Sequence, residues 1–283
     1  VKSAIFERPD DANKGTLGSL LCVCGSYGMA GAAVMSAKGA LRTGIGLAKC
    51  ALPRSIYPIV AQTILESVYY PLSENADGRI SKVNVPFLVS ESCKSSATLV
   101  GCGLGVCDDT LKIVFSLIEN STTPLVLDAD ALNCVAKQPE ILLRKKAPII
   151  ITPHPGEMSR LTGLATPLVN AERERVALDF AQKYGVVTVL KGAGTVIASP
   201  NGKVLVNPTG NSGMATGGSG DVLALGYQVF LGLADFWRNH KLALALGFAS
   251  IGDCAGYFGN NGHVLGLAHF KELGHAGKTT HDV

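Results

Sequence analysis

A glycine-rich stretch in the last third of the chain places one carboxylate at the start of an expected helix. It spans residues 210–223, contains five glycines, and ends in Asp221-Val222-Leu223 ahead of an apolar run. Glycine lets the backbone approach an anion closely, and the first helical turn offers unpaired N–H groups at the positive end of the helix dipole. The stretch therefore predicts an anion site, such as one for a phosphoryl group.

Asp221 has two interpretations, and the composition of the stretch favours neither. A carboxylate beside a bound phosphoryl group is electrostatically unfavourable unless it has a task, such as accepting the proton of a hydroxyl group. Alternatively, Asp221 caps the helix that follows a plain glycine-rich turn. The first interpretation describes phosphoryl transfer to an alcohol, and the second describes a structural residue.

The elements that must position this stretch alternate along the chain. Strands are expected over 20–24, 97–100, 124–127, 148–151 and 186–190, and helices over 31–41, 108–118, 131–136, 156–161, 169–184, 221–233 and 241–257. Asp108 or Asp109 is the expected cap of the second of these helices. Pro200-Asn201-Gly202, between strand-like runs at 195–198 and 203–206, predicts a hairpin.

Such alternation predicts an α/β fold, with a largely parallel central sheet, helices on both faces and the hairpin at one edge. The chain has no internal repeat and no Pro/Ser-rich linker. We therefore expect a single domain over residues 1–283, with a core over 14–260 and a C-terminal tail over 261–283. Ligands of such sheets bind beyond the carboxyl ends of the strands, where most of the glycine-rich stretches fall.

Composition and charge argue against several other classes of protein. With 47% hydrophobic and 17% charged residues the chain is not disordered, and a net charge of +3 is too small a bias to predict nucleic-acid binding. The sequence has no run of 18 apolar residues and no signal-peptide core over 1–13, so we expect no membrane association. The eight cysteines include no C-x-x-C pair, which favours reduced thiols and a cytoplasmic protein.

Residues 210–223 resemble the signature of the ADP-dependent (S)-NAD(P)H-hydrate dehydratases, and their core resembles the anion-hole motif of the ribokinase-like superfamily, which is related to carbohydrate kinases. Six further stretches match this family in order: 31–33, 41–47, 101–105, 127–133, 152–157 and 190–195. The resemblance implies a ribokinase-like three-layer α/β/α sandwich. The sequence departs from the family at Cys102, where Pro is usual, and at Ala224-Leu225-Gly226, where the family continues Ala-Gly.

The resemblance also implies an activity, the repair of hydrated NADH and NADPH. ADP would phosphorylate the hydroxyl group of the S epimer of the hydrate, and loss of phosphate would restore the double bond, leaving AMP and phosphate. Phosphate is a far better leaving group than hydroxide, which explains a lyase with a kinase fold. Mg²⁺ is expected as the counter-ion of the phosphates, with few direct protein ligands. The implied partners are small molecules and further copies of the chain, and we expect a homotetramer.

The resemblance assigns roles to individual residues. Asp221 is the expected base, and the amides near Gly218 to Gly220 are expected to stabilise charge on the moving phosphoryl group. Nucleotide binding is assigned to Lys191, Gly192, Ala193, Gly194, Thr195 and Gly220, and substrate binding to Ala32, Gly103, Gly105, His154 and Asp221. The alternative for residues 191–195 is a plain strand-to-strand turn.

Three acidic residues receive smaller roles. Glu157 resembles the acidic position that orients magnesium and phosphate through water, and it can equally cap the helix that follows it. We expect Asp128 and Asp130, which follow a buried strand, to shape their loop through hydrogen bonds rather than to bind a ligand.

Two other functions stay open at this point. A ribokinase-like kinase of a vitamin precursor would use the same Asp221 and the same anion site, and would stop at the phosphate ester. A nucleotide-binding regulator would not turn over at all. The matches at 152–157 and 211–216 favour the dehydratase over the kinase, and a carboxylate facing phosphate favours an enzyme over a regulator.

Overall fold

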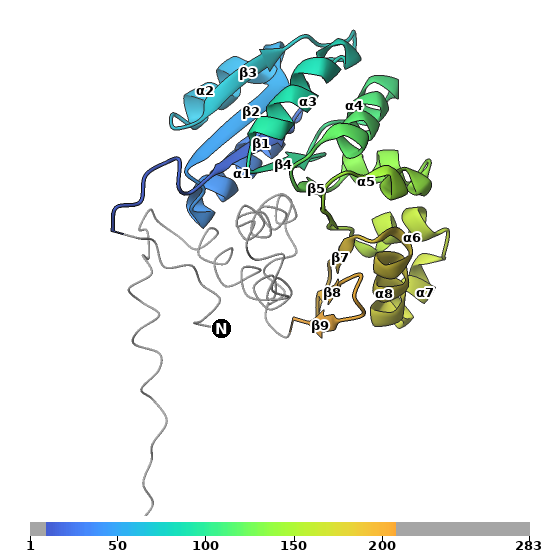
Figure 1. Ribbon diagram of the computed structural model, residues 1–283. Coiled ribbons are helices and arrows are strands. Elements are labelled where there is room, and N and C mark those ends of the chain that lie inside the picture. Colours follow the sequence, from blue (N-terminus) through green and yellow to red (C-terminus); the bar gives the residue numbers. More distant parts are fainter. Residues whose placement is uncertain (1–9, 208–283) are drawn as a thin grey trace, which may run out of the picture.

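The computed structural model describes residues 10–207, whose strands form one nine-stranded sheet (Figure 1). The strands are β1 (Ser19–Val23), β2 (Leu47–Pro53), β3 (Val68–Leu72), β4 (Ala97–Val100), β5 (Leu125–Leu127), β6 (Ile149–Ile151), β7 (Val187–Leu190), β8 (Val196–Ala198) and β9 (Val204–Val206). Their order in the sheet is β3-β2-β1-β4-β5-β6-β7-β8-β9. Neighbours from β3 to β7 pair in parallel, and β7, β8 and β9 pair antiparallel.

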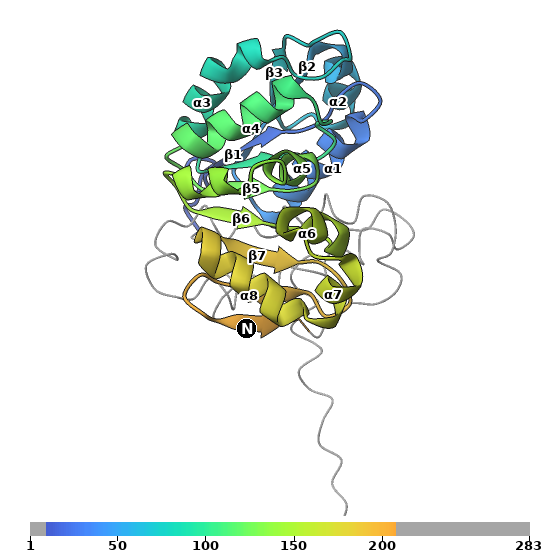
Figure 2. The ribbon, with the colours of Figure 1, turned by 90° about the vertical axis from the view of Figure 1, so that its right-hand side faces the viewer.

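Helices cover both faces of this sheet. They are α1 (Ala30–Thr43), α2 (Tyr57–Thr63), α3 (Val85–Lys94), α4 (Asp108–Asn120), α5 (Asp130–Val135), α6 (Pro155–Thr162), α7 (Thr166–Ala171) and α8 (Arg173–Tyr184), with short 3₁₀ turns η2 (Arg54–Ile56), η3 (Lys82–Asn84) and η4 (Pro139–Arg144). Helices α1 and α2 pack on one face, and α3 to α8 form the layer that faces the viewer in Figure 2. The predicted three-layer α/β/α arrangement is confirmed.

Each inner strand contributes to two separate cores, because strand side chains alternate between the faces of a sheet. In β1, Leu21 and Val23 pack beneath the larger helical layer, whereas Leu20 and Cys22 pack beneath α1 and α2. All four side chains are buried. A parallel strand covered on both faces is therefore apolar throughout, which is the pattern that predicted it.

The structure confirms the five predicted strands and the edge hairpin to within one residue. The helix expected over 169–184 is wrong, because Glu172 leaves the helical conformation (φ −125°, ψ 43°) and separates α7 from α8. No element was predicted between residues 47 and 94, where β2, α2, β3 and α3 lie. The helices expected over 221–233 and 241–257, and the tail, lie outside the described residues.

The predicted cap of α4 is also wrong. Cys107, not Asp108 or Asp109, is the capping residue, because its backbone is extended and Asp108 is already helical. The Cys107 N–H donates to Thr110 Oγ1 at 2.8 Å, which closes a reciprocal capping box. All seven cysteines within residues 10–207 are free thiols, as predicted. None of the helices in this range is long and apolar enough to cross a bilayer.

Candidate functional site

The strand order reverses between β1 and β4. From β1 the chain proceeds outward through β2 to β3, and from β4 it proceeds in the opposite direction to β7. The loops that follow β1 and β4 therefore diverge at the carboxyl edge of the sheet, which is where ligands of α/β sheets bind. These two loops lead to three of the predicted substrate-binding residues, Ala32, Gly103 and Gly105.

The loops after β1 and β4 are in direct contact. The Gly25 N–H donates to the Cys102 carbonyl at 2.8 Å, and Ser26 Oγ donates to the Gly103 carbonyl at 2.8 Å. Gly103 has φ +63°, and a Cβ there would lie 2.7 Å from the Cβ of Ala32. The structure thus brings Ala32 and Gly103 together, and only glycine fits the second position.

Asp130 fixes the far end of the loop after β4. Its Oδ2 accepts the Gly105 N–H at 2.8 Å, and its Oδ1 accepts from the Asn133 side chain at 3.3 Å. Asp128 is buried, and Cys102 Sγ lies 3.8 Å from its Oδ2. Both aspartates therefore form the loop-shaping contacts expected of them.

The loop after β6 is held by a reciprocal capping box at the start of α6. His154 Nδ1 accepts from the Gly156 and Glu157 N–H groups at 3.0 and 3.3 Å, and Glu157 Oε2 accepts the His154 N–H at 2.8 Å. With Nδ1 accepting, a neutral His154 ring carries its proton on Nε2. The His154 side chain is 50% exposed. Nε2 lies 3.5 Å from Glu157 Oε1, so both ring nitrogens face groups at the start of α6 and the orientation of the half-exposed ring is fixed.

Lys191, at the end of β7, lies between two buried carboxylates. Its Nζ is 2.7 Å from Asp128 Oδ1 and 3.9 Å from Glu157 Oε2, and the exposed fractions of the three side chains are 15%, 2% and 6%. Burial by itself lowers the pKa of Lys191, but the two carboxylates outweigh burial and raise that pKa. Burial raises the pKa of Glu157, and Lys191 opposes this only in part.

This cluster changes the physical role expected of the Lys191 side chain. The family resemblance implied that this cation binds the nucleotide, whereas in the structure the ammonium group faces Asp128 and Glu157. The cluster links the loops after β5, β6 and β7, and its single ammonium group is shared between two carboxyl groups. Nucleotide binding by this loop stays a prediction.

Arg173 supports the loop after β7 and was missed by the sequence analysis. Its Nη2 donates to the carbonyls of Leu190 and Gly194 at 2.9 and 3.4 Å. Gly192 has φ +151°, and a Cβ there would lie 2.8 Å from Arg173 Nη1. A continuous helix over 169–184 would have grouped Arg173 with the exposed charges around it. The break at Glu172 gave no signal in the sequence.

An open hollow of about 530 Å³ lies beside this loop. Its lining includes Ala193, Gly194, Val196 and the α7–α8 junction. A second hollow of about 470 Å³, between α6, α8 and η4, contains none of the predicted site residues. The first hollow is therefore the one suited to a ligand of the 191–195 loop.

The remaining predicted residues cannot be placed. Gly218, Gly220 and Asp221 lie outside the described residues, so their roles stay predictions. Within residues 10–207, no three His, Cys, Asp or Glu side chains gather as they would around a metal ion. The Glu157 carboxylate is buried against His154 and Lys191 and is not free to be a direct ligand. The described side chains do not form a resident metal site.

The fold and the switch-point loops define a ribokinase-like α/β protein. A ribokinase-like superfamily protein from Enterococcus faecalis has the same fold, with a TM-score of 0.73 at 22% identity over 91% of this chain and 88% of that chain. Residues 20–258 match the family model described as NAD(P)H-hydrate dehydratase. The chain belongs to the NAD(P)H-hydrate dehydratase family.

Individual relatives agree with this assignment. The chain is 38% identical to a bifunctional NAD(P)H-hydrate repair enzyme of Moorella thermoacetica, over 87% of this chain and 46% of that protein. It thus spans about half the length of the first curated relatives it matches. The ADP-dependent (S)-NAD(P)H-hydrate dehydratase of Bacillus subtilis is 31% identical over 90% of this chain and 86% of that protein.

A solved relative extends the comparison to structure. The ADP/ATP-dependent NAD(P)H-hydrate dehydratase of B. subtilis, co-crystallized with ATP/Mg²⁺, has a TM-score of 0.73 and 30% identity. The alignment covers 95% of this chain and 91% of that chain. The family resemblance inferred from short motifs is thereby confirmed over most of the chain.

Proposed function

We propose that this chain dehydrates the S epimer of hydrated NADH and NADPH, with ADP as the phosphoryl donor and AMP and phosphate as products. The observation that carries the proposal is the single edge shared by five neighbouring parallel strands. The loops after β1 and β4 offer close backbone approach, and the loops after β5, β6 and β7 are joined by the Lys191 cluster. Family membership supplies the reaction that this edge would serve.

The proposed chemistry has two steps. The hydroxyl oxygen of the hydrate attacks the β-phosphorus of ADP while Asp221 takes the hydroxyl proton, and AMP leaves. The C–O bond to the new phosphate group then breaks, a proton is lost from the neighbouring carbon, and the double bond of the ring is restored. Backbone amides at Gly218 to Gly220 would stabilise the charge on the phosphoryl group in flight.

The residues of the described loops would bind and orient the two reactants. Ala32, Gly103, Gly105 and the fixed ring of His154 would hold the hydrate. The loop 191–195 would hold the nucleotide, with the hollow beside it and Arg173 beneath it. Magnesium would enter the site bound to the phosphates of the nucleotide, because the described residues contain no cluster of side chains that could bind the ion by themselves.

The domain organisation, the location and the assembly of the protein belong to the same proposal. We place the catalytic unit in one domain with its core over residues 14–260, and we propose a cytoplasmic homotetramer. Sedimentation velocity would test the assembly, since a monomer at micromolar concentration would contradict it.

Absorbance at 340 nm tests the activity, because only the restored dihydronicotinamide absorbs there. The protein is mixed with hydrated NADH, magnesium and ADP, and parallel mixtures contain ATP or no nucleotide. We expect a rise that requires ADP and stops when the S epimer is consumed. A rise in absorbance with ATP but not with ADP would contradict ADP as the phosphoryl donor. In folded protein, no rise with any nucleotide would overturn the dehydratase and favour a kinase of another alcohol.

A further inference from the structure

The segment between β3 and η3 forms a short hairpin at the switch point. Glu74 and Ile80 are paired by an antiparallel bridge, and the Asn75 N–H donates to the Arg79 carbonyl at 2.9 Å. The Asn75 side chain closes the turn from within, since its Oδ1 accepts the N–H groups of Asp77 and Arg79, each at 3.1 Å. The position of Arg79 is therefore set by the backbone of the hairpin.

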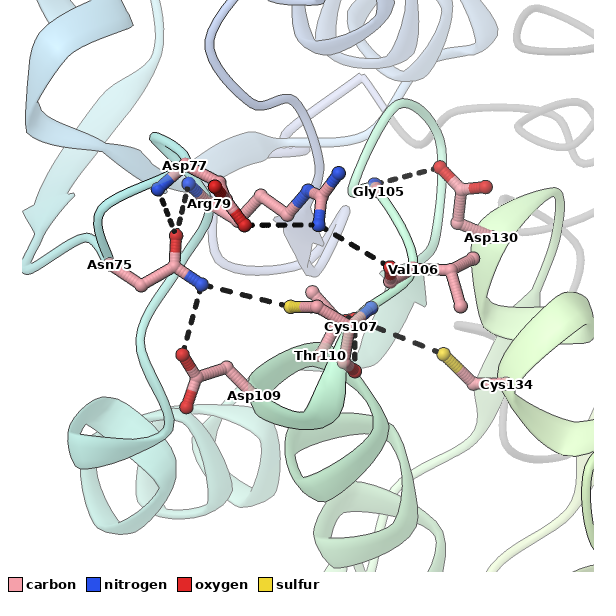
Figure 3. A network of polar contacts seen from close by, with 10 residues as sticks. All are labelled: Asn75, Asp77, Arg79, Gly105, Val106, Cys107, Asp109, Thr110, Asp130 and Cys134. Atoms are coloured by element: carbon pink, nitrogen blue, oxygen red, sulfur yellow. Dashed lines mark hydrogen bonds and ion pairs between the residues drawn. The ribbon is translucent and has the colours of Figure 1, made fainter.

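This hairpin is attached to both sides of the switch point. The Tyr27 N–H, in the loop after β1, donates to the Gly78 carbonyl at 2.9 Å. The Asn75 side chain donates to Asp109 Oδ2 at the start of α4, at 3.0 Å (Figure 3). The hairpin thus bridges the two loops that lead to the predicted substrate-binding residues.

The guanidinium group of Arg79 lies against Gly105. A Cβ at Gly105 would lie 2.5 Å from Arg79 Nε and 2.9 Å from its Cδ. Nη1 donates to the Val106 carbonyl at 3.4 Å and lies 3.5 Å from Asp77 Oδ2. Figure 3 draws both contacts. The Arg79 side chain is 31% exposed, so it is held in place and still reaches solvent.

The contacts of Arg79 leave it able to bind an anion. A guanidinium has five N–H donors in a planar fork that matches two phosphate oxygens. The Val106 carbonyl, Asp77 and the Cys107 thiol engage part of that set. Asp77 is a weak competitor, because its side chain is 67% exposed and surface ion pairs contribute little.

We propose that Arg79 binds a phosphate group of the dinucleotide substrate. The inference rests on the proposed function, since that substrate carries a pyrophosphate and, in its NADPH form, a further phosphate on the ribose. The glycines beside it supply close backbone approach and no charge. Arg79 supplies a cation for the substrate where the loops after β1 and β4 meet.

The test compares Arg79→Gln, Arg79→Lys and Asp77→Asn with the control Arg144→Gln, whose exposed side chain pairs with Glu119. In Arg79→Gln we expect KM for the hydrate to rise roughly tenfold, as for the loss of one charge-assisted hydrogen bond. The turnover number and KM for ADP stay within about twofold of the parent values. Arg79→Lys recovers part of the loss, and Arg144→Gln behaves as the parent.

Asp77→Asn provides an independent test if the Arg79 variants fold poorly. Removing this exposed carboxylate should lower KM for the hydrate by no more than about threefold, because surface ion pairs contribute little, and misfolding cannot produce such a gain. Each variant is assayed with hydrated NADH and with hydrated NADPH. Equal rises for both hydrates locate the contact at the pyrophosphate, and a rise for hydrated NADPH alone locates it at the ribose phosphate.

The contradicting results are distinct. Unchanged KM for both hydrates in a folded Arg79→Gln protein would overturn the inference and leave the proposed function standing. A parallel rise in KM for ADP would make Arg79 a structural residue and would also overturn it. If the parent protein restores no NADH from either hydrate, the proposed function fails first and the inference fails with it.

Discussion

The loops at the two halves of the carboxyl edge of the sheet are held together by different interactions. The loops after β1 and β4 contain several glycines and no charged side chain, and hydrogen bonds such as those from Gly25 and Ser26 join them. The loops after β5, β6 and β7 are joined by a buried ion cluster around Lys191. Net contributions of ordinary hydrogen bonds are about 1 kcal/mol each, whereas removing one partner of a buried ion pair costs about 3–5 kcal/mol.

This difference indicates how each half would meet its ligand. In the ion cluster, the charge of Lys191 is paired with Asp128 and Glu157, which holds the three loops together. We therefore expect the nucleotide to be bound by the backbone of these loops. The loops after β1 and β4, the glycine half, let a ligand approach the backbone closely. The one charge that we propose to face the ligand there is that of Arg79. The ionic half should therefore depend on charge for stability, and the glycine half on space and conformation for binding.

The largest effect is expected at Asp221, which would act between the two halves. Asp221→Asn should lower the turnover number roughly 10²–10⁴-fold, the range for loss of a general base, because the amide cannot take the hydroxyl proton. Affinity for ADP should stay near that of the parent. Steady-state rates at 340 nm and equilibrium dialysis with ADP measure the two quantities. Undiminished turnover would remove Asp221 from the chemistry.

Next is Lys191→Met, which leaves Asp128 and Glu157 buried without their cation. The free energy of unfolding should fall by about 3–5 kcal/mol, because uncompensated buried charges are costly. Lys203→Met is the matched control, since Lys203 is exposed on the edge hairpin. Urea denaturation measures both variants. Equal stability of the two would mean that the cluster does not hold the ionic half together.

Gly105→Ala tests the glycine half, and Gly163→Ala is its control. Their φ angles are nearly equal, +75° and +76°, but a Cβ at Gly105 meets Arg79 whereas one at Gly163 meets nothing within 4 Å. Both variants should lose about 1–2 kcal/mol of stability from the left-handed backbone. Only Gly105→Ala should also raise KM for the hydrate. Identical kinetics in the two proteins would contradict the close approach at Gly105.

The smallest effect concerns the pH dependence of stability at Glu157. Burial raises its pKa above the ordinary value of 4.5, so the folded protein binds the proton more tightly than the unfolded chain. The contribution of Glu157 to stability is therefore largest below pH 4.5 and declines as pH rises through the raised pKa. Urea denaturation of the parent and Glu157→Gln across this range should show the parent losing stability relative to the variant. The opposite slope would mean that Lys191 outweighs burial.

Much of the fold could be predicted because its inner strands are buried on both faces. Runs such as Leu20 to Cys24 are apolar without alternation, and the Pro200-Asn201-Gly202 turn gave the edge hairpin. Strand β3 was missed because it is an edge strand whose residues are mostly exposed or half-buried, with a proline inside it. The end of α7 was missed because no glycine or proline stands near Glu172 to mark a break in the helix.

The site was predictable where backbone conformation demands glycine and not where contacts are distant in sequence. Gly103 and Gly105 stand in a motif because positive φ angles and close packing require them. The pairing of Lys191 with Asp128 joins residues 63 positions apart, so no local spacing could reveal it. Arg79 likewise lies in a segment for which the sequence analysis predicted no element.

The stoichiometry of the reaction tests the central claim most directly. Hydrated NADH and ADP are incubated with the protein and magnesium, and AMP, phosphate and NADH are quantified together by chromatography. We predict equal amounts of all three, because each phosphorylated hydrate loses its phosphate as the double bond returns. AMP formed without phosphate or NADH, with a stable phosphate ester in their place, would show a kinase and contradict the dehydratase.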